Sequence, residues 1–390
     1  MKSSLDPLLF SKYKVLSDLK FCIVIPVKNE EEYVYESLGA FSHQKDISGN
    51  LLNVNLFEIL ILVNNCSDKS TTLIREFQNE NPKLNIFLEE ISLPADQANI
   101  GFVRKNLFQI AYDRLLKNGG GVILTTDADT IVSENWIAQN YLEINNGADA
   151  VGGRILLSLS EIENLDKSAY THHLKDEKYQ LLIAELETII LRNIDDPLPR
   201  HHQHFNGSFA ITTECFSKSG GVPDVTHLED IALYERLNLI DAKVRHSNNA
   251  VVYTSARCIG RSEIGLSHQL NLWKNMGIYG SKYYVESTES IIEKFTVKRK
   301  LMDLWQNKDA SIQGFISQMH KINPEFMLGE EDYFEFRDTT YFGEWFSFLL
   351  YKFENLLKHR PPELVDDAIL KLELAVRNYA DSGFFQTSMR

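Results

Sequence analysis

Two aspartates with one small residue between them are the first group in this sequence that predicts chemistry. Asp127 and Asp129 enclose Ala128 directly after the apolar run 121–126 (GVILTT). Carboxylates this close repel each other unless a positive charge lies nearby, and a divalent cation supplies such a charge. Hard oxygen ligands suit Mg²⁺ or Mn²⁺, which commonly also hold substrate phosphates. The pattern therefore predicts a metal site, with a solvated acidic turn as the alternative.

Two basic residues precede this pair in the chain. Arg104 and Lys105 open a segment with helical periodicity that leads into the same strand. Either residue can offset the charge of a phosphate or pair with Asp127. A charged helix start on the protein surface is the alternative.

A second acidic pair, Glu229 and Asp230, precedes the amphipathic segment 231–239. The amides at a helix start stabilise a carboxylate as an anion, and such a carboxylate can act as a general base toward a hydroxyl. The pair predicts either this catalytic role or a plain N-terminal helix cap, which the residue types alone favour.

Two weaker patterns complete the candidates. Arg257 and Arg261 stand four residues apart after the apolar run 251–253, so both can face one anion on a helix or in a tight loop, and ordinary ion pairs are the alternative. His201, His202 and His204 offer metal ligands. Adjacent histidines in a loop rarely all face one ion, so a substrate-contacting loop or a surface loop is the better interpretation.

The elements that must position these groups alternate between strand and helix. Apolar runs predict strands at 21–27, 57–63, 85–89 and 121–126, and helical periodicity predicts helices at 30–41, 71–80 and 102–116. This alternation is typical of a parallel, doubly wound α/β sheet, which binds ligands beyond the carboxyl ends of its strands. We therefore expect the polar segments that follow three of the strands to converge on one crevice, namely 28–30, 64–68 and 127–129.

The rest of the chain has a mainly helical pattern. Helices are expected over 160–192, 266–285 and most of 291–380, with returning strands at 206–212 and 251–253. The last helical segment carries an aromatic cluster between Tyr341 and Phe348, which is more typical of a packed helix face than of a lipid-binding one.

Composition limits the class of protein. The chain has 390 residues, of which 44% are hydrophobic and 24% charged, as in folded globular proteins. Its 40 Lys and Arg against 54 Asp and Glu give a formal charge of −14, which argues against a chain-wide basic surface for nucleic acid. Its four cysteines lie far apart and match no zinc or redox motif, which favours a reduced, cytoplasmic compartment.

The sequence also bears on membranes. No apolar run approaches the ~20 residues that a spanning helix needs, and 1–20 lacks the apolar core of a signal peptide. We therefore expect no transmembrane segment. Any membrane contact is expected to be peripheral, at the inner face.

Taken together, the motifs resemble those of family 2 glycosyltransferases with a GT-A fold, of the bacterial type. The resemblance rests on 25–30 (IPVKNE), 63–68 (VNNCSD), 101–106 (GFVRKN), 126–129 (TDAD), 206–210 (NGSFA) with 228–230 (LED), and 253–257 (YTSAR) with Arg261. Each motif alone is loose, and their order over residues 20–265 makes the resemblance specific. In 63–68, asparagines stand where the family usually has aspartate.

The resemblance implies an α/β GT-A fold built on a mostly parallel sheet. It implies a catalytic domain over 1–265, with a helical acceptor-side insertion at 160–204, and a helical C-terminal extension over 266–390. It also implies a nucleotide-sugar site made by Pro26, Val27, Lys28, Asn29, Glu30, Asn64, Asn65, Asp68, Arg104, Asp127, Ala128 and Asp129.

Roles follow from the same resemblance. Asp127 would bind ribose or metal, Asp129 would bind the metal on the diphosphate, and Arg104 would steady that charge. Asp230, with Glu229 beside it, would activate the acceptor hydroxyl in an inverting enzyme or orient it in a retaining one. The resemblance also implies that four residues face the acceptor or the diphosphate, namely Gly207, Ser208, Arg257 and Arg261.

The implied function is metal-dependent transfer of a sugar from a nucleotide-diphosphate sugar, expected to be a UDP-sugar. The acceptor would be a hydroxyl of a small molecule, a glycan or a lipid-linked compound. Two alternatives stay open. A non-catalytic sugar-nucleotide-binding scaffold would bind without turnover. A nucleotidyltransferase also uses paired aspartates, but it is expected to carry a glycine-rich phosphate loop where this chain has 28–32 (KNEEE).

Overall fold

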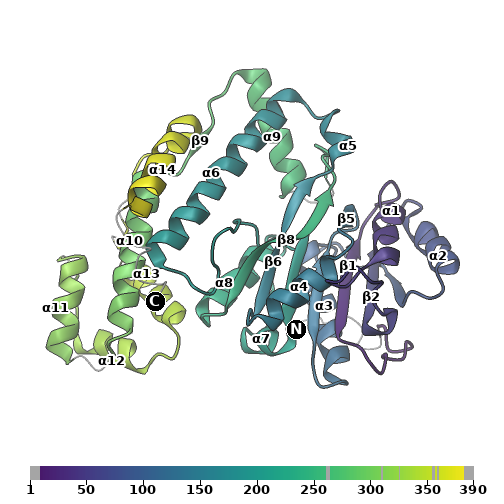
Figure 1. Ribbon diagram of the computed structural model, residues 1–390, viewed down its shortest axis with the longest axis horizontal. Helices are drawn as coiled ribbons and strands as arrows, with labels where there is room; N and C mark the ends of the chain where they lie inside the picture. The colour runs from purple at the N-terminus through teal and green to yellow at the C-terminus, as the bar shows by residue number, and fades with distance from the viewer. Residues whose placement is uncertain are drawn as a thin grey trace. The chain divides into compact units, whose positions relative to one another are not determined.

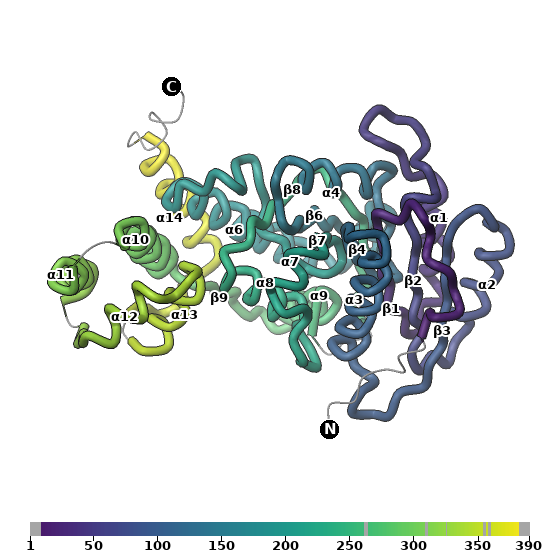
Figure 2. Tube along the Cα trace, turned by 90° about the horizontal axis from the view of Figure 1, so that it is seen from below, coloured from purple at the N-terminus to yellow at the C-terminus, as the bar shows by residue number. Residues whose placement is uncertain are grey.

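Apolar runs in the first third of the chain form neighbouring parallel strands in the computed structural model. The structure describes residues 9–381 except 261–263, 309–310, 325, 354–355 and 358–359. Within that part of the chain, one sheet has eight strands in the order β3-β2-β1-β4-β7-β6-β8-β5 (Figures 1 and 2). They are β1 (Phe21–Val27), β2 (Phe57–Asn64), β3 (Ile86–Ile91), β4 (Val122–Thr126), β5 (Thr130–Val132), β6 (Ala150–Leu157), β7 (Ser208–Thr212) and β8 (Val244–Thr254).

The sheet is mixed, with parallel pairs in the majority. β1 pairs in parallel with β2 and β4, β2 with β3, and β6 with β8. β7 runs antiparallel to β4 and β6, and β5 runs antiparallel to β8. Because parallel strands end at the same edge of a sheet, the segments that follow β1, β2 and β4 meet at one edge. The predicted α/β class with a mostly parallel sheet is confirmed.

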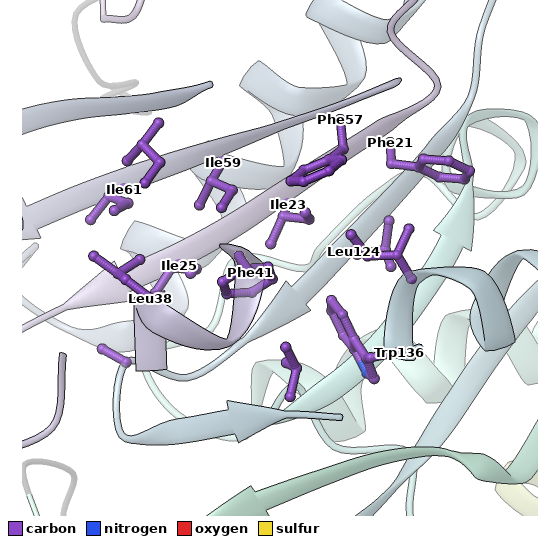
Figure 3. Close-up of a cluster of buried hydrophobic side chains, with 14 of the residues drawn as sticks. Phe21, Ile23, Ile25, Leu38, Phe41, Phe57, Ile59, Ile61, Leu124 and Trp136 are labelled. Atoms are coloured by element: carbon purple, nitrogen blue, oxygen red, sulfur yellow. The ribbon is translucent and has the colours of Figure 1, made fainter. Parts of the chain in front are cut away.

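Alternate residues of β1 and β2 are buried on opposite faces of the sheet, as the pleat requires. Phe21 and Ile23 pack on one face with Leu38 and Trp136 (Figure 3). Cys22 points to the other face, which α3 (Ile100–Leu116) covers, and is fully buried. A strand that is covered on both faces contains a continuous run of apolar residues, which is why these strands could be predicted from the sequence.

The described residues divide into two compact units. Among these residues, unit 1 covers 9–170, 203–236 and 243–275, and unit 2 covers 171–202, 237–242 and 276–381. The helices that begin in unit 1, besides α3, are α1 (Val34–Gly39), α2 (Ser70–Glu80), α4 (Trp136–Asn145), α5 (Leu159–Ile162), α6 (Lys167–Leu191), α7 (Thr213–Lys218), α8 (Glu229–Leu239) and α9 (Leu266–Tyr279).

Unit 2 is mainly helical. Tyr179 and Leu186 of α6 pack there with Phe295 and Leu372 in one apolar cluster. Most of the predicted 160–204 insertion therefore falls in unit 2 together with most of the predicted C-terminal extension, and the predicted domain division at residue 265 stays a prediction. The later elements are β9 (Tyr284–Val285), α10 (Thr288–Trp305), α11 (Ile312–Ile322), α12 (Glu330–Asp338), α13 (Phe342–Lys352), β10 (Glu363–Leu364) and α14 (Val365–Tyr379).

The aromatic cluster predicted between Tyr341 and Phe348 belongs to a second apolar cluster of unit 2. Trp345 is fully buried there and stacks on Trp305 with 5.4 Å between ring centroids. The prediction of a packed face is confirmed for this part of α13. Of the residues that the structure describes, none lies in a helix long and apolar enough to cross a membrane.

The structure corrects two predicted helix boundaries. α1 begins at Val34 rather than at residue 30, and residues 31–33 form a turn before it. The helix predicted over 266–285 ends at residue 279, before Gly280, whose φ of 61° favours glycine and is typical of helix ends.

Three elements of the sheet layer were not predicted: β5, α4 and β6. In β6 a glycine pair interrupts the apolar run, which weakens the strand signal. Gly152 is required by close packing, because a Cβ atom there would lie 2.3 Å from the carbonyl oxygen of Gln203. The side chain of Gln203 in turn bonds both the amide and the carbonyl of Ile155.

Candidate active site

The loops after β1 and β2 are locked together by short hydrogen bonds. The amide of Asn29 donates to Sγ of Cys66 (3.0 Å), and the amide of Ser67 donates to Oδ1 of Asn29 (2.8 Å). The side chain of Asn65 bonds both the amide and the carbonyl of Leu93. Asn29 and Asn65 have φ angles of 57° and 49°, a region that asparagine tolerates better than most residues. These asparagines therefore shape the edge of the sheet.

Asp68 ties the same two loops to the start of α2. Its carboxylate accepts hydrogen bonds from Oγ and the amide of Ser70 (2.6 and 3.0 Å) and from the amide of Glu31 (3.0 Å). Burial opposes ionisation, but these hydrogen bonds outweigh it and lower the pKa of Asp68. The Asp68 carboxylate is therefore charged, and both of its oxygens accept hydrogen bonds from within the protein.

Other predicted nucleotide-binding residues lie at the ends of the strands. Pro26 and Val27 are the last two residues of β1, Asn64 is the last residue of β2, and all three are buried. Lys28 is half-buried, and its Nζ donates to the carbonyl of Ala98 (3.5 Å). The structure therefore brings the predicted segments 26–30 and 64–68 together at one edge.

Arg104 forms the first ion-pair cluster at this edge. Its Nη2 lies 2.6 Å from Oδ1 of Asp127, and its Nε lies 3.2 Å from Oε1 of Glu229. Its Nη1 donates to Oγ1 of Thr125 (3.2 Å) and to the carbonyl of Asn206 (3.0 Å). The Arg104 side chain is 3% exposed and that of Asp127 is 39% exposed. Of the predicted alternatives, pairing with Asp127 is the one observed.

Arg257 forms the second cluster. It bonds both carboxylate oxygens of Glu30 (2.6 and 2.7 Å), and its Nη2 lies 2.9 Å from Oδ2 of Asp129. Oγ of Ser255 donates to the same Oδ2 (2.8 Å). Burial and the nearby Asp127 raise the pKa of Asp129, although Arg257 and Ser255 favour its charged form. An ion-paired arginine therefore links the ends of β1, β4 and β8.

Asp230 lies beside the first cluster, in the first turn of α8. Burial and the adjacent Glu229 raise the pKa of Asp230, against hydrogen bonds from the backbone amides of Ile231 and Asn206 and the charge of Arg104. The stabilisation of an anion expected at a helix start is present but outweighed. A buried carboxylate with a raised pKa suits a general base better than an ordinary surface aspartate does.

Gly207 and Ser208 differ in access. A Cβ atom on Gly207 would lie 3.3 Å from Oδ2 of Asp127 and 3.2 Å from Cδ1 of Ile155, so the bare backbone leaves room beside that carboxylate. Ser208 is fully buried, and its Oγ accepts a hydrogen bond from Nε1 of Trp136 (2.9 Å). The Ser208 hydroxyl therefore belongs to the core, away from an acceptor.

Three further candidates are placed as follows. Lys105 pairs with Asp224 (3.2 Å) and not with Asp127. Ala128 is buried in the core between the two aspartates. Arg261 lies outside the described residues, so the prediction that it shares an anion with Arg257 stays a prediction.

The histidine group does not gather around one point. His201 is fully buried, and the ring of His204 stacks on Tyr234 with 3.7 Å between centroids. In the part of the chain that the structure describes, no group of three or more His, Cys, Asp or Glu side chains is arranged to hold a metal ion.

Asp127 and Asp129 nevertheless offer the donor atoms that a hard divalent cation takes. The Asp127 side chain is 39% exposed, while Oδ2 of Asp129 already faces Arg257. Two carboxylates fit Mg²⁺ or Mn²⁺ when phosphate oxygens and water complete the coordination, as they commonly do for such ions. The residues present therefore fit the predicted ion.

Sequence reasoning missed Ser255, Tyr33 and Glu161. The ring centroid of Tyr33 lies 5.3 Å from the guanidinium of Arg257, and Oε2 of Glu161 accepts from the amide of Ala256 (2.8 Å). Ser255 had a usable signal, because it is a polar residue directly after a strand and close to an arginine. Tyr33 and Glu161 had none, because their partners are remote in the chain.

A comparison with known protein families gives a match in the part of the chain that contains these clusters. Residues 22–193 match the family model described as glycosyl transferase family 2, a range that includes β1, β2, β4 and the two aspartates. Over that range the chain is similar to glycosyl transferase family 2. The comparison with curated proteins gives no match.

Solved structures of glycosyltransferases are among those similar to this chain. A mannosyltransferase of Pyrobaculum calidifontis in complex with GDP-Man and Mn²⁺ has 11% identity and a TM-score of 0.44, covering 95% of this chain and 88% of that one. TarS 1–349 of S. aureus in complex with UDP has 12% identity and a TM-score of 0.44, covering 95% and 93%. Glucosyl-3-phosphoglycerate synthase of Mycobacterium tuberculosis, with Mn²⁺, UDP and phosphoglyceric acid, has 13% identity and a TM-score of 0.38, covering 70% and 84%.

Proposed function

We propose that this enzyme transfers a sugar from a UDP-sugar to a hydroxyl of its acceptor, with Mg²⁺ or Mn²⁺ at the two aspartates. The observation that carries the proposal is the pairing of Asp127 with Arg104 and of Asp129 with Arg257 at the edge where β1, β2 and β4 end. Guanidinium groups and a carboxylate-bound cation are the groups that hold a diphosphate.

The donor lies, in this proposal, across the interlocked loops. Segments 26–30 and 64–68 hold the base and ribose, and the hydrogen bonds between them keep that surface rigid. Arg104, fixed by Glu229 and Asn206, holds Asp127 in position. The divalent ion, when bound, supplies positive charge that stabilises the leaving diphosphate.

Asp230 acts on the acceptor. In an inverting reaction its carboxylate takes the proton of the acceptor hydroxyl while that oxygen bonds to the anomeric carbon and the bond to the diphosphate breaks. In a retaining reaction it orients the same hydroxyl. The raised pKa of Asp230 supports the first role, because a base whose pKa lies closer to working pH accepts a proton more readily. The acceptor is a small molecule, a glycan or a lipid-linked compound.

A turnover experiment tests this proposal. The wild type and Asp230→Asn are incubated with Mn²⁺, nucleotide-sugars and a panel of hydroxyl acceptors, and release of the nucleotide diphosphate is measured. We expect Asp230→Asn to bind UDP as tightly as the wild type and to release it about 10²–10⁴-fold more slowly. Asp224→Asn is the matched control, since this nearby carboxylate is 59% exposed and outside both clusters.

Three outcomes contradict the proposal in different ways. Release by Asp230→Asn at the wild-type rate removes Asp230 from catalysis. Tight UDP binding by the wild type without turnover of any donor favours the scaffold alternative. Release of pyrophosphate from a nucleoside triphosphate favours a nucleotidyltransferase.

A further inference from the structure

Asp129 already has a positively charged partner on one of its two carboxylate oxygens. Nη2 of Arg257 lies 2.9 Å from Oδ2 of Asp129, and Oγ of Ser255 donates to the same atom. A divalent cation on this carboxylate requires the same negative charge, and it repels the guanidinium at such short range. Arg257 and a metal ion therefore weaken each other's hold on Asp129.

Glu30 keeps Arg257 in this position. Its two carboxylate oxygens bond the two terminal nitrogens of the guanidinium at 2.6 and 2.7 Å, the bidentate geometry that arginine favours. The side chains of Arg257, Glu30 and Asp129 are 17%, 9% and 13% exposed, so solvent screens the three charges poorly. One guanidinium thus serves two carboxylates in a largely shielded place.

Asp127 is arranged differently. Its Oδ1 faces Arg104, and its side chain is 39% exposed, against 13% for Asp129. Asp127 can therefore accept a cation without losing its arginine. Of the two ion pairs, the one between Arg257 and Asp129 therefore opposes metal binding more strongly.

We infer that Arg257 is a resident cation on Asp129 that the nucleotide diphosphate draws away, so that nucleotide and metal bind cooperatively. The inference rests on the proposed function. A diphosphate offers Arg257 a stronger anionic partner, and Asp129 then becomes accessible to the metal. Because coupling between two ligands is reciprocal, the metal raises nucleotide affinity by the factor by which the nucleotide raises metal affinity. Arg257 is in this sense a positioning residue.

Titration with Mn²⁺ alone tests the competition, with the spectroscopic signal of free Mn²⁺ as the readout. We expect Arg257→Gln to bind Mn²⁺ about tenfold or more tightly than the wild type, because a unit charge at ion-pair distance is removed. Glu30→Gln is expected to have the opposite effect, since Arg257 then has Asp129 as its remaining carboxylate partner in this cluster. The double variant should behave like Arg257→Gln.

The same titrations with UDP present test the coupling. UDP should raise the Mn²⁺ affinity of the wild type and do so much less in Arg257→Gln, which should also bind UDP more weakly. Arg75→Gln is the control for loss of a positive charge, because Arg75 is an exposed arginine paired with Glu90 far from the two aspartates in sequence. It should leave both affinities unchanged.

Unchanged or weaker Mn²⁺ binding by Arg257→Gln overturns the inference, as does the absence of Mn²⁺ binding in every variant. A Glu30→Gln variant that binds Mn²⁺ more tightly than the wild type also contradicts it. The proposed function fails by a separate result, namely that the wild type binds no nucleotide diphosphate with or without Mn²⁺. The two failures are therefore distinguishable.

Discussion

Helix α3 carries a buried arginine toward each of its ends, and the two make very different ion pairs. Near the last turn, Arg114 bonds both carboxylate oxygens of Glu58 at 2.6 and 2.8 Å, and the Glu58 side chain is 0% exposed. Near the first turns, Arg104 pairs with Asp127, which is 39% exposed, and with the buried Glu229. Both arginines are almost fully buried, so the difference lies in their carboxylate partners.

The difference follows from the place of each pair on the sheet. Glu58 lies at the amino-terminal end of β2, where Arg114 also donates to the backbone carbonyls of Phe10 and Tyr13 and so fastens the N-terminal segment. Asp127 follows the carboxyl end of β4, the edge at which α/β sheets bind ligands. A pair that is closed on all sides stabilises the fold, and a pair with one accessible oxygen leaves that oxygen for a ligand.

The largest expected effect is on the closed pair. Arg114→Gln leaves the buried Glu58 carboxylate without its cation, which should lower the free energy of unfolding by about 3–5 kcal/mol. Urea denaturation measures this change. Nucleotide affinity of the folded variant should match the wild type, because Arg114 lies at the opposite edge of the sheet. A loss under about 1 kcal/mol would show that the pair is not the anchor described here.

Arg104→Gln should affect stability less and nucleotide affinity more than Arg114→Gln does. Asp127 can return to water, and the buried Glu229 keeps a hydrogen bond from Nδ2 of Asn206 (3.2 Å), so the loss of stability should be smaller than for Arg114→Gln. Affinity for UDP with Mn²⁺ should fall about tenfold or more, since a charge-assisted hydrogen bond that positions Asp127 is lost. Calorimetric titration and urea denaturation of the same preparation test both parts. If both substitutions lower stability equally and UDP affinity does not change, the two arginines do not have the different roles described here.

The pH dependence of the ligand-binding edge should differ from that of an ordinary aspartate. The pKa of Asp230 is raised, so its contribution to stability is present below the ordinary value of about 3.9 and is lost as pH rises through the folded-state pKa. Activity runs the other way, because the base must be ionised. Nucleotide release should rise with pH about tenfold per unit below that pKa. Stability curves of the wild type and Asp230→Asn should diverge over the same range, and parallel curves would remove Asp230 as the titrating group.

The smallest effect is expected at Gly207. A methyl group there would enter the space beside Oδ2 of Asp127, where contacts of 3.2 and 3.3 Å oblige neighbours to shift by a few tenths of an ångström. Gly207→Ala should lower Mn²⁺-dependent UDP affinity by a few-fold and stability by about 1 kcal/mol or less. Gly39→Ala, at a position with open space, is the control. Equal behaviour of the two variants would show that the space beside Asp127 is not used.

Much of the ligand-binding edge could be predicted from the sequence, because β1, β2 and β4 are covered on both faces and so read as apolar runs that end in polar residues. The pairing of Arg104 with Asp127 was one of three stated alternatives. The pair Arg257–Glu30 joins residues 227 positions apart, and nothing local in the sequence indicates it. The sequence equally gave no reason to pair Glu58 with Arg114, because Glu58 stands inside an apolar run.

The central claim is that the two aspartates and their arginines form a metal-dependent nucleotide site. Its most direct test is the thermal stability of the wild type and Asp129→Asn with UDP, GDP, CDP and dTDP, each with and without Mn²⁺. A nucleotide at ~100 times its dissociation constant adds about 2.7 kcal/mol to the free energy of unfolding. We predict a Mn²⁺-dependent rise in melting temperature with UDP that Asp129→Asn lacks. No rise with any nucleotide, or an equal rise in Asp129→Asn, would contradict the claim.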